Sequence, residues 1–349
     1  MSTQVAEPKV AKKVVKGEEE ILFPFIQNDK IGYVDRAGEI VVIPHYAIPE
    51  KEKGKAESRI LLIATHGFRE GLAPVQIGDS WGFIDVTGKV VIDPDFEEAG
   101  VFQEGYAPVQ LSGRWGYIDK KGNIIINPQY EDVDLFSGGF APIKKDNRWG
   151  FVGTDGDVLI EPQFDGITGN RWNLIQNPRF SKGHFAEGLT GARIGKKWGY
   201  IDRKGRFAVK PQFEDAHSFF EGVAAVKFAG RWGYIDPNGH YAINPQFDEV
   251  GGFGDGAAPA RSNSEWGYID KRAHWLANPQ FQDAHSFFES LAAVKFNNEW
   301  GYVDPAGKYV IDPEYDDAGD FENGVAPVLS DKKWGYIDKE GMYVLNPTS

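Results

Sequence analysis

Two histidines occupy equivalent positions in a repeated sequence segment, so the fold could bring them close enough to act together. His217 and His285 each occupy the third position of the segment Asp-Ala-His-Ser-Phe-Phe, 68 residues apart. Imidazoles that a repeat brings into line could bind a metal ion or respond to pH near neutrality. Copying of one ancestral segment explains the pair more simply, and we expect neither a metal site nor a cofactor. The remaining histidines, which form no cluster with metal-ligand spacing, are His45, His66, His184, His240 and His274.

An aspartate also recurs in nearly every unit, and these carboxylates could together bind cations. Most of them begin a four-residue turn that ends in glycine, as in Asp236-Pro237-Asn238-Gly239. An aspartate at the first position of such a turn accepts hydrogen bonds from the backbone of the turn. This structural role is the favoured interpretation for all of these aspartates, which are Asp35, Asp85, Asp119, Asp202, Asp236, Asp270, Asp304 and Asp338.

Other catalytic patterns are missing from the sequence. The chain has no cysteine, which excludes disulfides and thiolate chemistry. It contains no glycine-rich phosphate loop between a strand and a helix, and no serine nucleophile motif. Nothing singles out a carboxylate pair for glycoside hydrolysis among 51 acidic residues. We therefore expect no enzyme, with a site shared between repeat units as the alternative.

The organising feature is a repeated Trp-Gly dipeptide. Successive copies lie 34 residues apart, except for one interval of 49 residues. A further copy begins at Ile31, 50 residues before the first tryptophan, and a proline follows 13 residues after each of these nine positions. Because one small unit cannot bury its own apolar face, neighbouring units must stack. We expect the stacking residues to be Trp81, Trp115, Trp149, Trp198, Trp232, Trp266, Trp300 and Trp334.

The two long intervals are insertions that fall in the same place of the repeat. They span about residues 48–66 and 166–184 and mix basic with apolar residues in an otherwise acidic chain. Insertions in repeat proteins map to loops on one side, and exposed Trp and Arg are typical of binding hot spots. Neutral loop length is the alternative. The candidate partner-binding residues are Lys51, Lys53, Lys55, Arg171, Trp172, Arg179 and Phe180.

Each unit is expected to fold as three strands. Proline and glycine interrupt every stretch too soon for paired helices, and the residues between them are strand formers. In the unit 212–245, strands near 224–228, 232–236 and 240–244 form a β-meander that ends at Pro245. Gly233 is expected to allow close approach of a neighbouring backbone or ring.

The units resemble the WG-repeat family, which shares the pattern G-x-A-P-V, W-G-Y-I-D, a glycine and I-x-P-x-[FY]. The resemblance covers about residues 21–347 and implies an all-β repeat architecture without a known shared activity. Because the unit is shorter than a usual propeller blade and no unit is split between the two ends, we expect an open twisted array. A closed β-propeller-like arrangement is the alternative. The nine units lie near 21–44, 73–94, 95–128, 129–162, 190–211, 212–245, 246–279, 280–313 and 314–347 within an array spanning 21–349.

Composition limits the partners. The formal net charge is −13, which disfavours nucleic acid and anionic lipid. Residues 1–20 mix Lys and Glu with few apolar residues, so we expect a flexible tail and no signal peptide. No apolar run is long enough to insert into a membrane. We expect a cytoplasmic scaffold that presents an acidic, aromatic-rich surface to a protein partner, with a glycan or cell-envelope ligand as the alternative.

Overall fold

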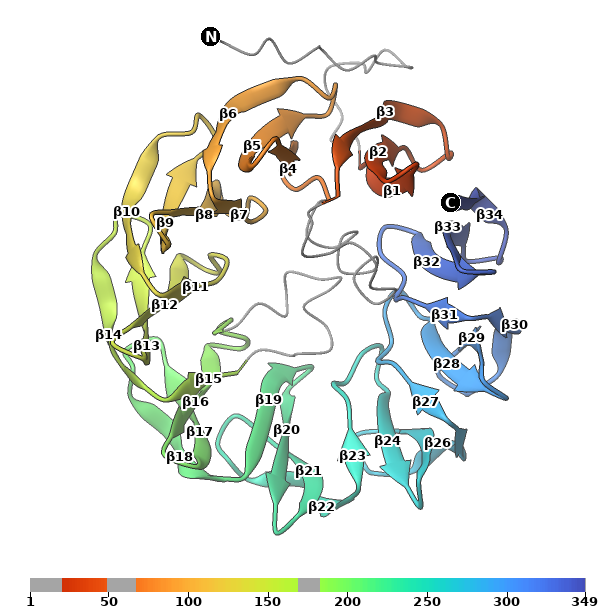
Figure 1. Cartoon of the computed structure of the whole chain (residues 1–349). Coiled ribbons are helices and arrows are strands. Elements are labelled where there is room, and N and C mark those ends of the chain that lie inside the picture. The colour runs from red at the N-terminus through yellow and green to blue at the C-terminus, as the bar shows by residue number, and fades with distance from the viewer. Residues whose placement is uncertain (1–20, 49–66, 169–182, 349) are drawn as a thin grey trace, which may run out of the picture.

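The computed structural model describes residues 21–48, 67–168 and 183–348. Within them the chain forms 34 strands and no helix, and no segment is a helix that could cross a membrane. The strands make nine antiparallel sheets, which follow one another as blades around a common centre (Figure 1). The expectation of an open array is therefore wrong, and the closed propeller-like alternative is correct.

The first four blades are built in chain order from the inside of the ring to the outside. Blade 1 contains β1 (Phe23–Gln27), β2 (Lys30–Val34) and β3 (Ile40–Ala47); blade 2 contains β4 (Leu72–Ile77), β5 (Ser80–Asp85) and β6 (Val90–Phe96); blade 3 contains β7 (Glu98–Ala99), β8 (Tyr106–Leu111), β9 (Arg114–Asp119) and β10 (Ile124–Tyr130); blade 4 contains β11 (Asp132–Val133), β12 (Phe140–Lys145), β13 (Arg148–Gly153) and β14 (Val158–Phe164).

The other five blades each have four strands. Blade 5 contains β15 (Gly166–Ile167), β16 (Leu189–Ile194), β17 (Lys197–Asp202) and β18 (Phe207–Phe213); blade 6 contains β19 (Asp215–Phe220), β20 (Val223–Phe228), β21 (Arg231–Ile235) and β22 (Tyr241–Phe247); blade 7 contains β23 (Glu249–Val250), β24 (Ala258–Ser262), β25 (Glu265–Ile269) and β26 (Trp275–Phe281); blade 8 contains β27 (Asp283–Ala284), β28 (Ala292–Phe296), β29 (Glu299–Val303) and β30 (Tyr309–Tyr315); blade 9 contains β31 (Asp317–Ala318), β32 (Val325–Ser330), β33 (Lys333–Asp338) and β34 (Tyr343–Thr348).

A short inner strand explains how 34 residues make a four-stranded blade. In six blades this strand has only two residues, such as β23, which pairs Glu249 with Arg261 and Val250 with Ala260. These residues were expected in a connection between units, with three strands per unit. Seven of the nine sheets have four strands instead. Two residues are too few to show the alternation by which a strand is recognised in a sequence.

The proline of the repeat does not end the outer strand. In blade 6, β22 continues past Pro245 to Phe247, which lies opposite Trp232. The register shifts between this pair and the pair Tyr234–Ile243. The outer strand bends over Gly233 there, and a Cβ on this glycine would lie 2.5 Å from the carbonyl oxygen of Ile243. The Trp-Gly dipeptide therefore needs glycine because another backbone occupies the space of its side chain.

Buried residues form nine clusters, one at each junction between neighbouring blades. At the junction of blades 6 and 7, Trp232 and Tyr234 from one blade pack with Val250, Ala260 and Ile269 from the next. The other junctions repeat this arrangement. Each blade thus buries the face that carries its Trp-x-Tyr pair, or the equivalent Ile-x-Tyr in blade 1 and Trp-x-Phe in blades 2 and 4, against the opposite face of the following blade.

The residue two positions after each tryptophan lies deepest in these junctions. The tryptophans are buried or half-buried, whereas this second aromatic is at most 3% exposed in every blade. Removing one such ring from water is worth several kcal/mol, at about 25 cal/mol per Å². The tyrosines and phenylalanines at this position are Tyr33, Phe83, Tyr117, Phe151, Tyr200, Tyr234, Tyr268, Tyr302 and Tyr336.

The ring closes with the same contacts that join the other blades. The hydroxyl of Tyr302 in blade 8 donates to the carbonyl oxygen of Gly319 in blade 9 at 2.8 Å. Tyr336 in blade 9 donates at 2.8 Å to the carbonyl oxygen of Pro24 in blade 1, and its ring centroid lies 5.5 Å from that of Phe23. Blade 9 would otherwise expose its Tyr face, and blade 1 the face that receives it. Closure therefore needs no blade divided between the two ends of the chain.

We predict that Gly233→Ala lowers the free energy of unfolding by about 3 kcal/mol, because the added methyl group meets backbone that cannot move alone. The control is Gly222→Ala, whose backbone φ is +87° and whose Cβ would have no neighbour within 4 Å. It should cost only about 1 kcal/mol, from the left-handed conformation. Chemical denaturation measures both values. Equal losses would contradict the assigned role of the Trp-Gly glycine.

Closure of the ring in solution can be tested with Tyr336→Phe and Tyr302→Phe. Each removes one hydrogen bond of the same kind, worth about 1 kcal/mol. In a closed ring the two variants should lose similar stability in denaturant unfolding. In an open array Tyr336→Phe would have no effect, because its partner Pro24 would be far away.

Candidate binding site at the ring closure

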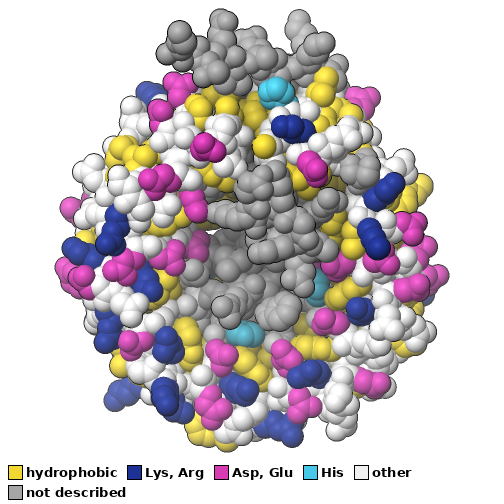
Figure 2. All heavy atoms as spheres, viewed as in Figure 1, with side chains coloured by type: hydrophobic (Ala, Val, Ile, Leu, Met, Phe, Trp, Pro, Cys, Tyr) yellow, Lys and Arg dark blue, Asp and Glu magenta, His cyan; other side chains and the backbone are white. Residues whose placement is uncertain are grey.

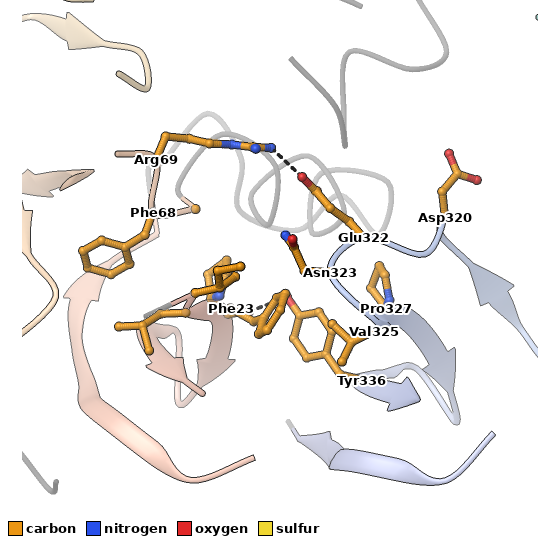
Figure 3. A pocket seen from close by; sticks show the side chains of 13 residues that line it. Phe23, Phe68, Arg69, Asp320, Glu322, Asn323, Val325, Pro327 and Tyr336 are labelled. Carbon is orange, nitrogen blue, oxygen red and sulfur yellow. Dashed lines mark hydrogen bonds and ion pairs between the residues drawn. The ribbon is translucent and has the colours of Figure 1, made fainter. Parts of the chain in front are cut away.

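A cavity lies where blades 9, 1 and 2 meet (Figure 3). Its volume is about 70 Å³, and β1, β32, β33 and residues 67–69 before β4 contribute to its wall. Blades 1 and 2 are the two sheets with three strands in the described part of the chain. The residues that line it include Phe23, Phe68, Arg69, Asp320, Glu322 and Tyr336.

Aromatic rings form the apolar part of this cavity. Phe23 and Tyr336 meet at the closing junction, and Phe68 packs edge-on against Tyr33 with ring centroids 4.8 Å apart. Tyr336 cannot rotate freely, because its hydroxyl is bound to blade 1. The apolar wall is therefore fixed by the contacts that close the ring.

One ion pair spans the cavity. Arg69 from blade 2 and Glu322 from blade 9 approach to 3.0 Å, and their side chains are 29% and 34% exposed. Burial raises the pKa of Glu322, Arg69 opposes this shift, and the nearby carboxylates of Glu289 and Asp320 add to it. The pair is partly shielded from water and connects the blades on either side of blade 1 (Figure 3).

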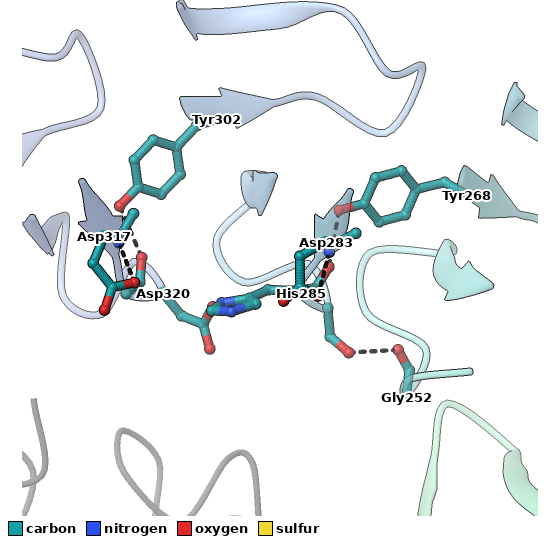
Figure 4. Close-up of polar contacts among 11 residues, drawn as sticks. Gly252, Tyr268, Asp283, His285, Tyr302, Asp317 and Asp320 are labelled. Atoms are coloured by element: carbon teal, nitrogen blue, oxygen red, sulfur yellow. Dashed lines mark hydrogen bonds and ion pairs between the residues drawn. The ribbon is translucent and has the colours of Figure 1, made fainter. Parts of the chain in front are cut away.

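A second polar pair lies beside the cavity at the junction of blades 8 and 9. The Nδ1 atom of His285 lies 2.8 Å from a carboxylate oxygen of Asp320, whose side chain is only 12% exposed (Figure 4). Burial lowers the pKa of His285, but Asp320, Asp283 and Asp317 more than offset this, and the net shift is upward. His285 also packs against Trp300, with ring centroids 4.9 Å apart. The carboxylate thus favours the charged imidazole.

The equivalent histidine in blade 6 has a different environment. His217 packs on Trp232 in the same way, with ring centroids 4.7 Å apart. Its Nδ1 atom is buried and has no hydrogen-bond partner among the described residues. Gly252 stands 35 residues after His217, where Asp320 stands relative to His285. Burial therefore lowers the pKa of His217, and the two histidines do not form one paired site.

The cavity combines an apolar wall with charged groups, which suits an amphipathic side chain or a small ligand. Among the described residues, no group of three or more His, Asp or Glu side chains is arranged to hold a metal ion. His285 and Asp320 are oriented as a base and its carboxylate partner. No hydroxyl hydrogen bond to this imidazole is present within the described residues. The arrangement can therefore hold a ligand by apolar contact with the wall and by polar contact with the charged groups.

The structure accounts for the predicted turn aspartates. In blade 6 a carboxylate oxygen of Asp236 accepts hydrogen bonds from the backbone N–H groups of Asn238 and His240, both at 2.9 Å. The same pattern recurs at Asp119, Asp202 and Asp338. The residues predicted to bind a partner lie outside the described residues; they are Lys51, Lys53, Lys55, Arg171, Trp172, Arg179 and Phe180.

Sequence reasoning did not find Arg69, Asp320 or Glu322. In the sequence these residues can be recognised only because they differ from the residues at the equivalent positions of other units. Arg69 and Glu322 occupy the same position of their units, where blades 5, 6 and 7 have Ala186, Phe220 and Gly254. Only the closed ring shows that two such departures, 253 residues apart, face one another.

The fold and its junctions define a nine-bladed β-propeller. The model of the WG containing repeat matches residues 81–115, 115–149, 149–171, 198–232, 232–265, 266–300 and 300–334. The matches cover more than half of the chain, which therefore belongs to the WG-repeat family.

The chain is similar to solved structures at low sequence identity. A eukaryotic initiation factor shares the fold; it is 10% identical with a TM-score of 0.59, over 93% of this chain and 95% of the other. The dihydro-heme d1 dehydrogenase NirN is 14% identical with a TM-score of 0.48, over 97% and 76% of the two chains. Hsv2p from Kluyveromyces lactis is 7% identical with a TM-score of 0.41, over 68% and 90%. Among curated proteins, none matches this sequence.

We predict opposite pH effects for His285→Gln and His217→Gln. The raised pKa of His285 means that its stabilising contribution is present below about pH 6.5 and is lost as the pH rises through the folded-state pKa. The lowered pKa of His217 means that its neutral form is favoured and that stability is lost as the pH falls below about 6.5.

Melting temperatures at about pH 5.5 and 8.5 test this difference. His285→Gln should destabilise the ring more at the lower pH. His217→Gln should improve stability at the lower pH relative to the higher one. Shifts that do not change with pH would show that these histidines do not titrate between the two conditions.

Proposed function

We propose that this propeller is a non-catalytic scaffold that holds a protein partner, and that it acts in the cytoplasm. One observation carries the proposal. The residues that define the repeat are used at the blade junctions or in turns, as Tyr234 and Asp236 illustrate. Residues that differ between blades are the candidates for partner recognition, because the junctions and turns that all blades share do not depend on them.

The closing cavity is one place where such residues gather. Arg69 and Glu322 face one another above an aromatic wall that contains Phe23 and Tyr336. Buried aromatic anchors beside a charged pair are typical of interface hot spots. A partner side chain with an apolar body and a polar end would fit this combination.

The inserted segments supply the second set of proposed contacts. These segments contain basic and aromatic residues, whereas the chain as a whole has a net charge of −13. They are therefore suited to an acidic or apolar region of a partner that the rest of the surface would not attract. An acidic surface is part of the proposal and rests on this net charge. On the face seen in Figure 2, acidic and basic side chains are interspersed around the rim, so the acidity there is spread rather than gathered in one patch.

We predict that replacing the candidate residues of the insertions abolishes partner recovery without unfolding the ring. One variant carries Ser at Lys51, Lys53 and Lys55, and a second carries Ala at Arg171, Trp172, Arg179 and Phe180. The control carries Ser at Lys121, Lys204 and Lys333, which are exposed lysines on blade turns and edges. Loss of an aromatic or arginine anchor costs about 2 kcal/mol or more, which reduces affinity at least about tenfold.

Affinity capture followed by mass spectrometry compares these variants with the parent chain. The melting temperature of each variant shows whether the ring is intact. Recovery of the same proteins at the same yield from all variants would rule out the insertions as the binding surface. Absence of any specific protein with the parent chain would argue against the scaffold itself.

A further inference from the structure

One position of the repeat divides the ring into two halves. It is the first residue of the outer strand in each blade, opposite the second residue after the Trp-Gly dipeptide. In blades 1–4 this residue is aliphatic: Ile40, Val90, Ile124 and Val158. In blades 5–9 it is aromatic: Phe207, Tyr241, Trp275, Tyr309 and Tyr343, which we call the aromatic arc.

The rings of the aromatic arc are held in place and remain partly exposed. Tyr241 and Tyr343 are 41% and 39% exposed, and the other three are half-buried. Trp275 meets Phe247 of the preceding blade at 5.8 Å with an interplanar angle of 81°. Phe207, Tyr309 and Tyr343 make similar edge contacts with the preceding blade. An edge contact holds a ring in position and leaves much of its face exposed, so these four rings can act as stacking platforms, and Tyr241 is the most exposed ring of the arc.

Polar groups with balanced charge lie next to these rings. Arg206 precedes the ring of blade 5 and pairs with Asp202 at 2.7 Å. His240 and His274 precede the rings of blades 6 and 7, are 81% and 70% exposed, and lie within 3.3 Å of the aspartates that begin their turns. Lys308 stands at the same position before the ring of blade 8, and its backbone N–H bonds to Asp304. Each of these basic residues thus lies four positions after the aspartate that begins its turn.

We propose that the aromatic arc binds a neutral polysaccharide along the outer wall of blades 5–9. The arc repeats once per blade, which suits a polymer of repeated units rather than a compact ligand. Aromatic faces stack on the C–H faces of sugars, and the neighbouring carboxylates and imidazoles can hydrogen-bond to hydroxyl groups. The choice of a neutral chain rests on the net charge of −13 and on the aspartate that begins each of these turns, because both disfavour a polyanion. This binding is independent of the proposed protein scaffold.

The test is affinity electrophoresis of the full chain in native gels that contain hydroxyethylcellulose, glucomannan or mixed-linkage β-glucan, with alginate as the anionic comparison. The double variant Tyr241→Ile and Tyr343→Ile places in blades 6 and 9 the residue type that blades 1–4 have at this position. It should bind at least one of the neutral polymers about tenfold more weakly, because two aromatic contacts are lost. The variant Tyr241→Phe and Tyr343→Phe keeps the rings and should keep binding.

The matched control is Ile124→Ala with Val158→Ala, which changes equally exposed residues at the same repeat position in blades 3 and 4. It should leave retardation unchanged. The proposal is overturned if the parent chain is retarded by none of the neutral polymers, if only alginate retards it, or if the control weakens binding as much as the isoleucine variant. Melting temperatures confirm that each variant is folded before it is compared.

Discussion

The structure depends on one interaction, the docking of the Trp-x-Tyr face of each blade on the opposite face of the next. At most junctions a fully buried tyrosine also donates a hydrogen bond to a backbone carbonyl oxygen of the neighbouring blade, as Tyr302 does to Gly319. A buried hydroxyl without a partner costs free energy, so this bond fixes the angle at which one blade meets the next. Because the same contact recurs, the angle recurs, and the chain curves until its ends meet. The closing junction buries Phe23, Phe25, Val34, Val325 and Tyr336, which an open array would leave in water at a cost on the order of 10 kcal/mol.

The sequence was sufficient to predict the local features of this fold. The spacing of Trp-Gly, proline and turn aspartate gives the number of units, three of the strands in each unit and the reason for glycine at Gly233, but it misses the short inner strand. It was not sufficient for the closure. The absence of a split blade favoured an open array, because propellers are often closed by strands from both ends within one blade. Here the closing force is face-to-face packing rather than strand pairing, and nothing in the first or last unit alone indicates that the two faces are complementary.

The candidate sites also separate residues that all units share from residues that only some units have. Residues that every unit shares are used to build the ring, and the features that could recognise a ligand are those that some units lack. Arg69 and Glu322 are recognisable as departures in the sequence, but their 3.0 Å contact depends on the closing of the ring. The aromatic arc is visible in the sequence as a column of five rings after four aliphatic residues. Its partial exposure could not be predicted, because the same residue could have been covered by the preceding blade.

The two related histidines show why a repeated motif does not by itself define chemistry. His217 and His285 lie in the same six-residue segment and pack on equivalent tryptophans. Their ionisation differs because Asp320 of the following blade contacts His285 and raises its pKa, whereas the repeat has Gly252 at the equivalent position and burial lowers the pKa of His217. The pKa of a side chain at a junction is therefore a property of two blades. Both neighbouring blades contribute to the surroundings of each side chain at a junction. A substitution in one unit can therefore change how an unchanged residue of the neighbouring unit behaves.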